Sequence, residues 1–264
     1  MANLLIVAEK PSVAKNIANA LGVKENGKHE GYIEGFADYF GFTVWVAWCL
    51  GHLVQMSFPE EYDPKYAKWR LEDLPLLPEE FKYEVIPETK KQFQIVTKLM
   101  NSVGESEQDK KEKSTLSRDN KFLVPVESLV CATDAGREGE LIFRLVYNQC
   151  RCKKPFERLW ISSMEDAAIR EGFAHLKPGT AYDFLFEAAL CRERADWIVG
   201  MNATRLFSLS EPLKNPNLFI WSTVVRSVSP EKGSDLLLLS GNQRLKTAVI
   251  VFPFGAYFGV VFVF

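Results

Sequence analysis

Acidic and basic side chains stand together directly after two short apolar runs of the sequence. Glu9 and Lys10 follow the first run, and Asp134 follows the second, with Arg137 and Glu138 a few positions later. Carboxylate oxygens, completed by water and a substrate phosphate, are the usual ligands of Mg²⁺. Positive side chains beside the acids are what a phosphate-binding site needs. The residue types therefore indicate magnesium-dependent chemistry at a phosphate group.

The placement of these acids favours a site, although an isolated carboxylate most often caps a helix or faces solvent. Glu9 and Asp134 each follow an expected strand of a parallel sheet. Ligands bind such sheets at the carboxyl ends of their strands, so we expect the two acids to converge in space. Glu138 and Glu140 enter the next helix near the positive end of its dipole, where acids are stabilised.

Strands and helices alternate along the first 208 residues, which predicts an α/β domain with a mainly parallel sheet flanked by helices. Continuous apolar runs are typical of strands that are buried on both faces. Apolar residues at helical spacing follow most of these runs. The expected strands are 3–8, 39–49, 128–133 and 156–161, and the expected helices cover 11–21, 90–100, 141–146, 164–176 and 182–207.

Two stretches interrupt this alternation. Residues 58–77 are rich in Pro, Tyr, Trp and charge, which is typical of an irregular excursion. Residues 104–121 hold almost no large apolar side chains and predict a solvated insertion. The Tyr and Trp side chains within 62–69 could stack on bases. Packing within the loop is their commoner role, so we leave them outside the site.

Composition sets limits on the class of protein. The chain has 264 residues, 47% of them hydrophobic, and a formal net charge of −2, which is ordinary for a globular protein and excludes no nucleic-acid partner. Five cysteines without a CxxC pair argue against a secreted disulfide scaffold and against a zinc ribbon. The N-terminus lacks the pattern of a signal peptide. We therefore expect a cytoplasmic protein with reduced thiols.

The composition changes after residue 208. Residues 209–264 include four consecutive leucines and end in an uncharged run, 248–264. That run is at the lower limit for crossing a bilayer, and Pro253 and Gly255 interrupt it. Its β-branched and aromatic residues fit buried strands or an aggregation-prone segment better than a helix. We expect an irregular apolar tail and no membrane partner.

Basic and amide side chains share one side of the last expected helix. Arg194 and Arg205 fall within about 20° of each other at 100° per residue, and Asn202 flanks Arg205. Such a row suits contacts with a DNA backbone, which position a strand without reading its sequence. Surface ion pairs of Arg192 and Arg194 are the alternative, each worth less than about 1 kcal/mol. His52 lies in a glycine-bearing turn, where either a DNA contact or a structural role fits.

Five blocks of the sequence stand in order along the first 208 residues. They are AEKPSVAKNIANALG from Ala8, GHL at 51–53, ATDAGREGELIFR at 132–144, LWISSMEDAAIREGF at 159–173 and RERADWIVGMNATRLFS at 192–208. Together they resemble the N-terminal part of type IA DNA topoisomerases, most closely the bacterial topoisomerase III branch, over residues 1–208. The resemblance implies a Toprim domain, a nucleotidyl-transfer fold shared with primases, over 1–160 with the insertion 104–121, then the helical start of the DNA-binding core over 161–208. Residues 209–264 form a tail outside the family.

The resemblance also implies a role for each candidate residue. Glu9 matches the Toprim glutamate, a general acid/base at the scissile phosphodiester and a ligand of Mg²⁺, and Lys10 matches the lysine that stabilises the phosphate. Asp134 and Glu138 match the outer acids of the DxDxE metal motif, whereas Gly136 occupies the place of the middle acid. We expect one Mg²⁺ between Glu9 and Asp134, with Glu138 helping directly or through water. The expected DNA-binding residues are His52, Arg137, Arg192, Arg194, Asn202 and Arg205.

The activity that the resemblance implies is magnesium-dependent cleavage of one DNA strand by a tyrosine, passage of another strand and religation. The substrates would be single-stranded or negatively supercoiled DNA in a bacterial cytoplasm, in association with the nucleoid. The TY-x-RTD block that carries the family's tyrosine is absent, and Tyr257 has no adjacent Arg or Asp. We therefore expect a truncated or frame-shifted chain that supplies the metal and phosphate half of the site. A non-catalytic DNA-binding remnant and a Toprim nuclease or primase-like enzyme are the alternatives.

Overall fold

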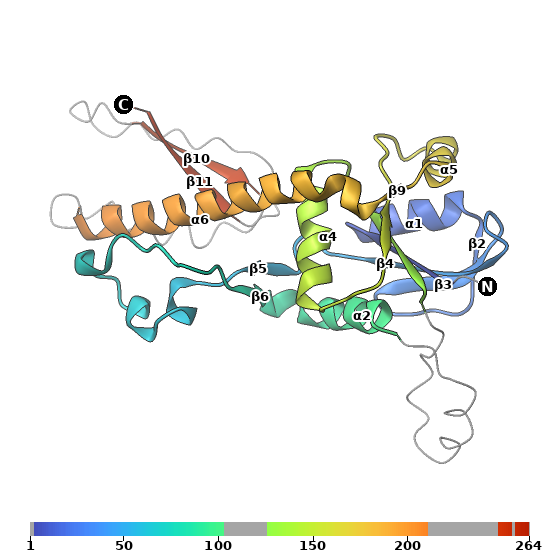
Figure 1. The fold of residues 1–264 in the computed structure, drawn as a ribbon, viewed down its shortest axis with the longest axis horizontal. Coiled ribbons are helices and arrows are strands. Elements are labelled where there is room, and N and C mark those ends of the chain that lie inside the picture. Colours follow the sequence, from blue (N-terminus) through green and yellow to red (C-terminus); the bar gives the residue numbers. More distant parts are fainter. Residues whose placement is uncertain (1–2, 103–125, 211–247, 255–256, 264) are drawn as a thin grey trace, which may run out of the picture. The chain divides into compact units, whose positions relative to one another are not determined.

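Figure 1 shows the computed structural model, which describes residues 3–102, 126–210, 248–254 and 257–263. The chain divides into two compact units that are interleaved along the sequence. The first unit consists of Met1–Gln55 and Tyr83–Leu190, and the second of Met56–Lys82 and Cys191–Phe264. The chain thus leaves the first unit, returns to it and leaves it again. The predicted segments 1–160, 161–208 and 209–264 instead follow one another along the sequence.

A mixed sheet of seven strands forms the centre of the first unit as far as the structure describes it. Its central strands pair in parallel, in the order β4-β1-β7-β8, while β2-β3-β4 on one side and β8-β9 on the other pair antiparallel. The predicted α/β fold with a mainly parallel sheet is confirmed, and its edges are antiparallel. The strands are β1 (Leu4–Ala8), β2 (Val23–Glu25), β3 (Tyr32–Ala37), β4 (Phe42–Trp48), β7 (Ser128–Ala132), β8 (Phe156–Arg158) and β9 (Lys177–Pro178).

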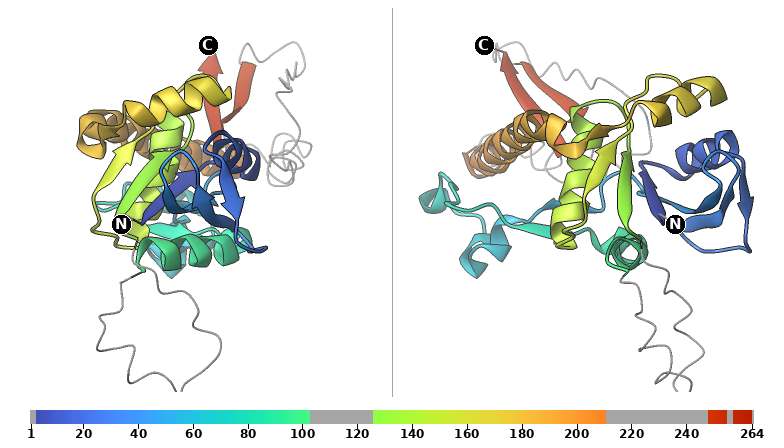
Figure 2. Two further views of the ribbon diagram at one scale, coloured as in Figure 1. Left: turned by 90° about the vertical axis from the view of Figure 1, so that its right-hand side faces the viewer. Right: turned by 45° about the vertical axis from the view of Figure 1, so that its right-hand side comes forward.

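The middle strand β1 is buried along its whole length, as its continuous apolar run predicts. Leu5 and Val7 belong to the core cluster on one face, and Leu4, Ile6 and Ala8 to the cluster on the other. Residues of α2 and α4 complete the first cluster and residues of α1 and α5 the second. Figure 2 shows α1 and α4 on opposite sides of the sheet. Helices therefore pack on both faces of the sheet.

The helices begin and end close to the predicted positions. Helix α1 has Pro11 in its first turn, where the fixed φ of proline suits a helix and the missing N–H has no intrahelical role. It ends before Gly22, whose φ of +65° is the left-handed conformation that favours glycine after a helix. The first-unit helices are α1 (Pro11–Ala20), α2 (Lys90–Met100), α4 (Arg137–Gln149) and α5 (Asp166–Ala174), with single turns η4 (Pro87–Thr89) and η5 (Gly179–Tyr182). Helix α6 (Asp183–Ser210) begins in the first unit and continues in the second.

The second unit is built around Trp197 of α6, which is 2% exposed. Its indole Nε1 donates a hydrogen bond to the carbonyl oxygen of Ser57 at 3.1 Å, and the rings of Tyr62 and Phe81 pack against it. The predicted irregular excursion consists mainly of short 3₁₀ turns. These are η1 (Pro59–Glu61), η2 (Pro64–Ala67) and η3 (Leu71–Asp73), and the strands β5 (Val54–Met56) and β6 (Tyr83–Val85) pair where the excursion begins and ends.

The predicted insertion 104–121 and most of the predicted tail lie outside the described residues. Within the tail, β10 (Ala248–Phe254) and β11 (Tyr257–Val263) pair as an antiparallel hairpin. These strands agree with the β-branched and aromatic content of the run 248–264, which favours strands over a helix. Among the described helices, none is both long and apolar enough to cross a membrane. The five cysteines are free thiols.

Candidate metal and phosphate site

Glu9 and Asp134 lie together at the carboxyl edge of the sheet. Ala8 pairs with Ala132 in the parallel β1–β7 ladder, so the residues that follow the two strands leave the sheet side by side. The carboxylate oxygen Oε2 of Glu9 accepts a hydrogen bond from the backbone N–H of Asp134 at 3.3 Å. The side chain of Glu9 is 9% exposed, whereas Asp134 is exposed. The two residues therefore lie side by side, joined by the Glu9 carboxylate and the Asp134 backbone, and a shared metal ion stays a prediction.

Lys10 completes this pair of acids with a positive charge. Its Nζ lies 3.3 Å from Oε1 of Glu9, and its side chain is 57% exposed. The carboxylate of Glu9 is thus held by two different groups, the ammonium of Lys10 and the amide of Asp134. Because the ammonium group remains largely in solvent, it can contact a phosphate oxygen without leaving Glu9.

Glu138 has a different immediate partner. His52 Nε2 lies 2.6 Å from Oε1 of Glu138, and the His52 side chain is 8% exposed while that of Glu138 is 65% exposed. The structure therefore brings Glu9 and Asp134 together and pairs Glu138 with His52. Among the residues that the structure describes, no group of three His, Cys, Asp or Glu side chains lies close enough to hold a metal ion.

The loop after Asp134 and the first turn of α4 each contain a glycine. Gly139 passes so close to Asp134 that a Cβ atom would overlap the carbonyl oxygen of Asp134, and Thr133 Oγ1 donates to the Gly139 carbonyl at 2.7 Å. Gly136 has extended backbone and open space where its Cβ would stand. Arg137 is exposed at the first position of α4. Close packing therefore requires Gly139, whereas the site has room for a side chain at Gly136.

A buried ion-pair network lies behind this loop and was not predicted from the sequence. Glu140, which was expected at the start of the helix near the positive end of its dipole, is 0% exposed, and so is Arg158. Arg158 Nε donates to one carboxylate oxygen of Glu140 at 2.9 Å, and Arg144 Nε to the other at 2.8 Å. Arg144 also pairs with Asp183 at 2.8 Å. The four-residue spacing of Glu140 and Arg144 was the one signal in the sequence.

The predicted DNA-binding residues of α6 do not form an exposed row. The amide of Asn202 accepts from the backbone N–H of Leu76 at 2.6 Å and donates to its carbonyl oxygen at 3.0 Å. Arg205 is 3% exposed, and its guanidinium lies 5.3 Å from the ring centre of Trp69. Burial lowers the pKa of Arg205. Both side chains hold the segment Met56–Lys82 against α6 within the second unit, and their DNA contact stays a prediction.

The two earlier arginines of α6 lie nearer the surface. Arg192 pairs with Asp196 at 3.7 Å, and both side chains are about two-fifths exposed, which matches the surface ion pair that the sequence analysis weighed as the alternative. The guanidinium of Arg194 lies 5.2 Å from the ring centre of Phe81. An exposed ion pair of this kind contributes little to stability, and the DNA contact of both arginines stays a prediction.

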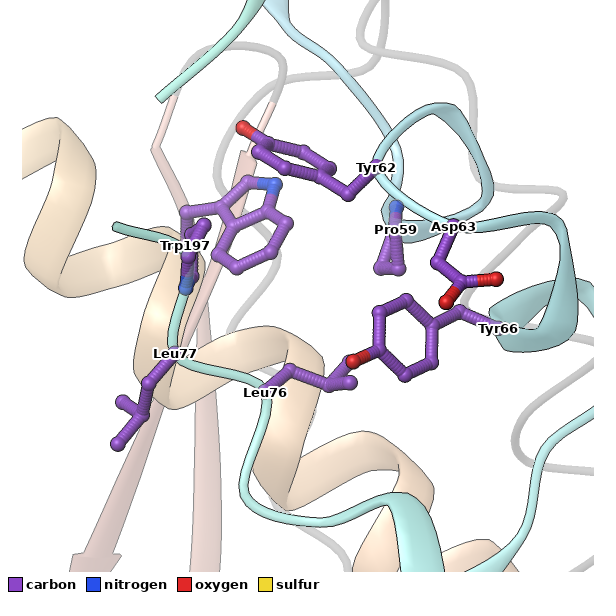
Figure 3. Close-up of a pocket in the computed structure, with 8 residues that line it drawn as sticks. Pro59, Tyr62, Asp63, Tyr66, Leu76, Leu77 and Trp197 are labelled. Atoms are coloured by element: carbon purple, nitrogen blue, oxygen red, sulfur yellow. The ribbon is translucent and has the colours of Figure 1, made fainter. Parts of the chain in front are cut away.

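A cavity of about 250 Å³ opens in the second unit. Figure 3 shows Tyr62, Tyr66 and Trp197 around it, with Leu76 and Leu77 on another side. No candidate site residue from the sequence analysis lines it. Tyr62 packs on Trp197, and the ring of Trp69 lies over the guanidinium of Arg205, so both rings have partners within the second unit.

Three comparisons with known proteins bear on this geometry. Residues 4–164 match the model of the Toprim domain family. DNA topoisomerase 3 of Bacillus thuringiensis (strain Al Hakam) is 48% identical over 205 residues, which are 78% of this chain and 24% of that protein. DNA topoisomerase 3 of Staphylococcus epidermidis is 49% identical over 201 residues, 76% of this chain and 24% of that protein. The chain spans about a quarter of the length of these relatives.

A solved structure is similar at lower identity. Full-length topoisomerase I of Thermotoga maritima matches 77% of this chain and 26% of its own length, with a TM-score of 0.44 and 20% sequence identity.

Proposed function

Because the chain belongs to the Toprim domain family, we propose that it is the metal- and phosphate-binding part of a type IA DNA topoisomerase of the topoisomerase III kind. The whole enzyme would cleave one DNA strand, pass another through the break and reseal it. The observation that carries the proposal is the contact of 3.3 Å between Glu9 Oε2 and the amide of Asp134, with Lys10 beside it. The high identity to two bacterial DNA topoisomerase 3 proteins supports it.

The donor set at this sheet edge fits Mg²⁺. Glu9 and Asp134 offer oxygen ligands only, and Mg²⁺ is usually held by one or two carboxylates together with waters and substrate phosphate. The ion would neutralise charge on the phosphate. Glu138 would join directly or through water once it separates from His52.

The chain's own side chains would do the remaining chemistry. Lys10 would hold a phosphate oxygen, since its ammonium is exposed beside Glu9. Glu9 would move a proton at the scissile phosphodiester, since a carboxylate positioned at the reacting group can act as a general acid or base. Arg137 and His52 would contact the DNA strand. The attacking tyrosine would come from a part of the enzyme that this sequence does not contain.

The proposal is tested on the chain as it exists. Mg²⁺ binding is measured by titration calorimetry, single-stranded DNA binding by fluorescence anisotropy, and activity by relaxation of negatively supercoiled plasmid together with a covalent-adduct assay. We expect Mg²⁺ and DNA binding without relaxation and without an adduct. Plasmid relaxation by this chain alone would contradict the proposal that it supplies only the metal- and phosphate-binding part of the active site. Magnesium-dependent nicking that is lost in Glu9→Gln would favour a Toprim nuclease. DNA binding in the absence of any Mg²⁺ binding would favour a non-catalytic remnant.

Gly136 offers a gain-of-function test. The extended backbone and open space at this position accept a side chain, and an acid here would restore the middle member of the DxDxE pattern. Gly136→Asp is expected to tighten Mg²⁺ binding about 5- to 10-fold, because an added carboxylate raises the negative charge of the site. Gly136→Asn, of the same size without the charge, is the control. Equal tightening in both variants would show that charge is not the cause.

A further inference from the structure

Arg158 stands out because it is fully buried and every nitrogen of its guanidinium donates a hydrogen bond. Nε donates to Glu140 at 2.9 Å. Nη2 donates to the carbonyl oxygen of Asp134 at 2.6 Å, and Nη1 donates to that of Thr133 at 2.8 Å. Nη1 also reaches the carbonyl oxygens of Cys131 at 3.1 Å and Leu159 at 2.7 Å. Most of these acceptors belong to the end of β7 and the residues just after it.

These contacts fix the backbone where it leaves the sheet. Beyond Ala132 the β1–β7 ladder has ended, so the carbonyl groups of Thr133, which is buried, and of Asp134 need donors from outside the ladder. Arg158 supplies both. The N–H of Asp134 donates to Glu9, and its carbonyl accepts from Arg158. The peptide groups on both sides of the Asp134 Cα atom are therefore held, which fixes the direction in which its Cβ leaves the backbone.

The charge of Arg158 is balanced on the side away from β7. Glu140 receives Arg158 on one carboxylate oxygen and Arg144 on the other. The ring of Trp160 lies 5.1 Å from the guanidinium and stacks on Tyr182. The planar guanidinium group of arginine, with its five N–H donors, suits this arrangement. The ammonium group of lysine has only three donors, on a flexible side chain.

We propose that Arg158 is a positioning residue of the metal site, which sets the direction of the Asp134 carboxylate by holding the backbone carbonyls of Thr133 and Asp134. The inference rests on the proposed function, because the purpose of that positioning is Mg²⁺ binding. Side chains around a metal ligand commonly set its affinity 10- to 100-fold.

Arg144 provides a matched control. It shares Glu140 with Arg158, its side chain is 12% exposed, and it also stacks on an aromatic ring, that of Phe156. Its other hydrogen bonds go to Gly179 and Asp183 and not to β7. A purely structural role of the network predicts similar results for both arginines, whereas positioning predicts a loss of affinity for Arg158 alone.

The experiment compares the wild-type chain with Arg158→Lys and Arg144→Lys. Mg²⁺ affinity is measured by calorimetry, Mn²⁺ binding by electron paramagnetic resonance, and stability by urea unfolding. We expect Mg²⁺ binding at least 10-fold weaker in Arg158→Lys and within 2-fold of wild type in Arg144→Lys. If Arg158→Lys binds Mg²⁺ as tightly as the wild type does, or if both variants lose affinity equally, the inference is overturned while the proposed function stands. No binding by the wild type overturns the proposed function and the inference with it.

A second measurement needs no substitution, so it holds even if a variant fails to fold. Mg²⁺ is titrated into ¹⁵N-labelled wild-type chain while the Nε–H signal of Arg158 and the amide signal of Asp134 are followed. Both signals are expected to shift together along one saturation curve, and the Nε–H signal of Arg144 much less. A shift of Asp134 without any shift of Arg158 would count against the coupling.

Discussion

Replacing Glu140 by alanine is expected to lower the free energy of unfolding by about 3–5 kcal/mol, the usual cost of removing one partner from a buried ion pair. Arg158 would keep its full burial and its charge but lose the carboxylate at 2.9 Å. A loss of this size is a large fraction of the 5–15 kcal/mol by which typical domains are stable. Urea unfolding followed by circular dichroism measures the effect.

Asp183→Ala is the control for this prediction. Asp183 belongs to the same network through Arg144, but its side chain is 50% exposed. Its removal is expected to cost less than about 1 kcal/mol, because exposed ion pairs contribute little. Equal losses in the two variants would mean that burial of Glu140 does not determine its contribution.

Glu9→Gln is expected to weaken Mg²⁺ binding about 100-fold, because the site relies on few carboxylates and loses one charge. The amide of glutamine keeps an oxygen that can accept the Asp134 N–H, so the metal-free stability should change little. Calorimetry measures the affinity, and thermal unfolding without metal checks the fold.

Glu138→Gln is the matched comparison. The Glu138 carboxylate is paired with His52 at 2.6 Å, so its neutralisation is expected to weaken Mg²⁺ binding only a few-fold. A loss as large as that of Glu9→Gln would show instead that Glu138 leaves His52 and binds the ion directly.

The sequence was informative where local patterns determine structure. Helix α2 has the predicted bounds, Lys90–Met100, because apolar residues recur at helical spacing along a polar stretch. The meeting of Glu9 and Asp134 was predictable for a topological reason. Two acids that each follow a strand must share an edge if the strands are parallel neighbours, and β1 and β7 are.

The antiparallel edge of the sheet was not predicted. Strand β3 (Tyr32–Ala37) contains Glu34 and Gly35 and lacks a continuous apolar run. Gly35 is needed because the carbonyl oxygen of Lys24 on β2 lies where a Cβ would stand. Such close approach depends on the neighbouring strand, so no local pattern of the sequence reveals it.

The partners of charged residues were also not predicted where they are distant in the sequence. Glu140 and Arg158 are each ordinary surface residues by type, and only the packing of α4 against β8 brings them together and buries them. Helical spacing places Arg205 and Asn202 on one side of α6, but the segment Met56–Lys82 covers that side. Helical spacing shows which residues share a side and not what packs on it.

The order β4-β1-β7 has a consequence for synthesis on the ribosome. β1 is made first, yet one of its two neighbours begins at Ser128. At roughly 5–20 residues per second, that edge of β1 waits on the order of 6–25 seconds for its partner. During this time a strand of five apolar residues has unpaired N–H and C=O groups on one side, which other chains can pair with. The nascent chain therefore has a window for aggregation, and a chaperone that covers β1 would raise the yield of folded protein.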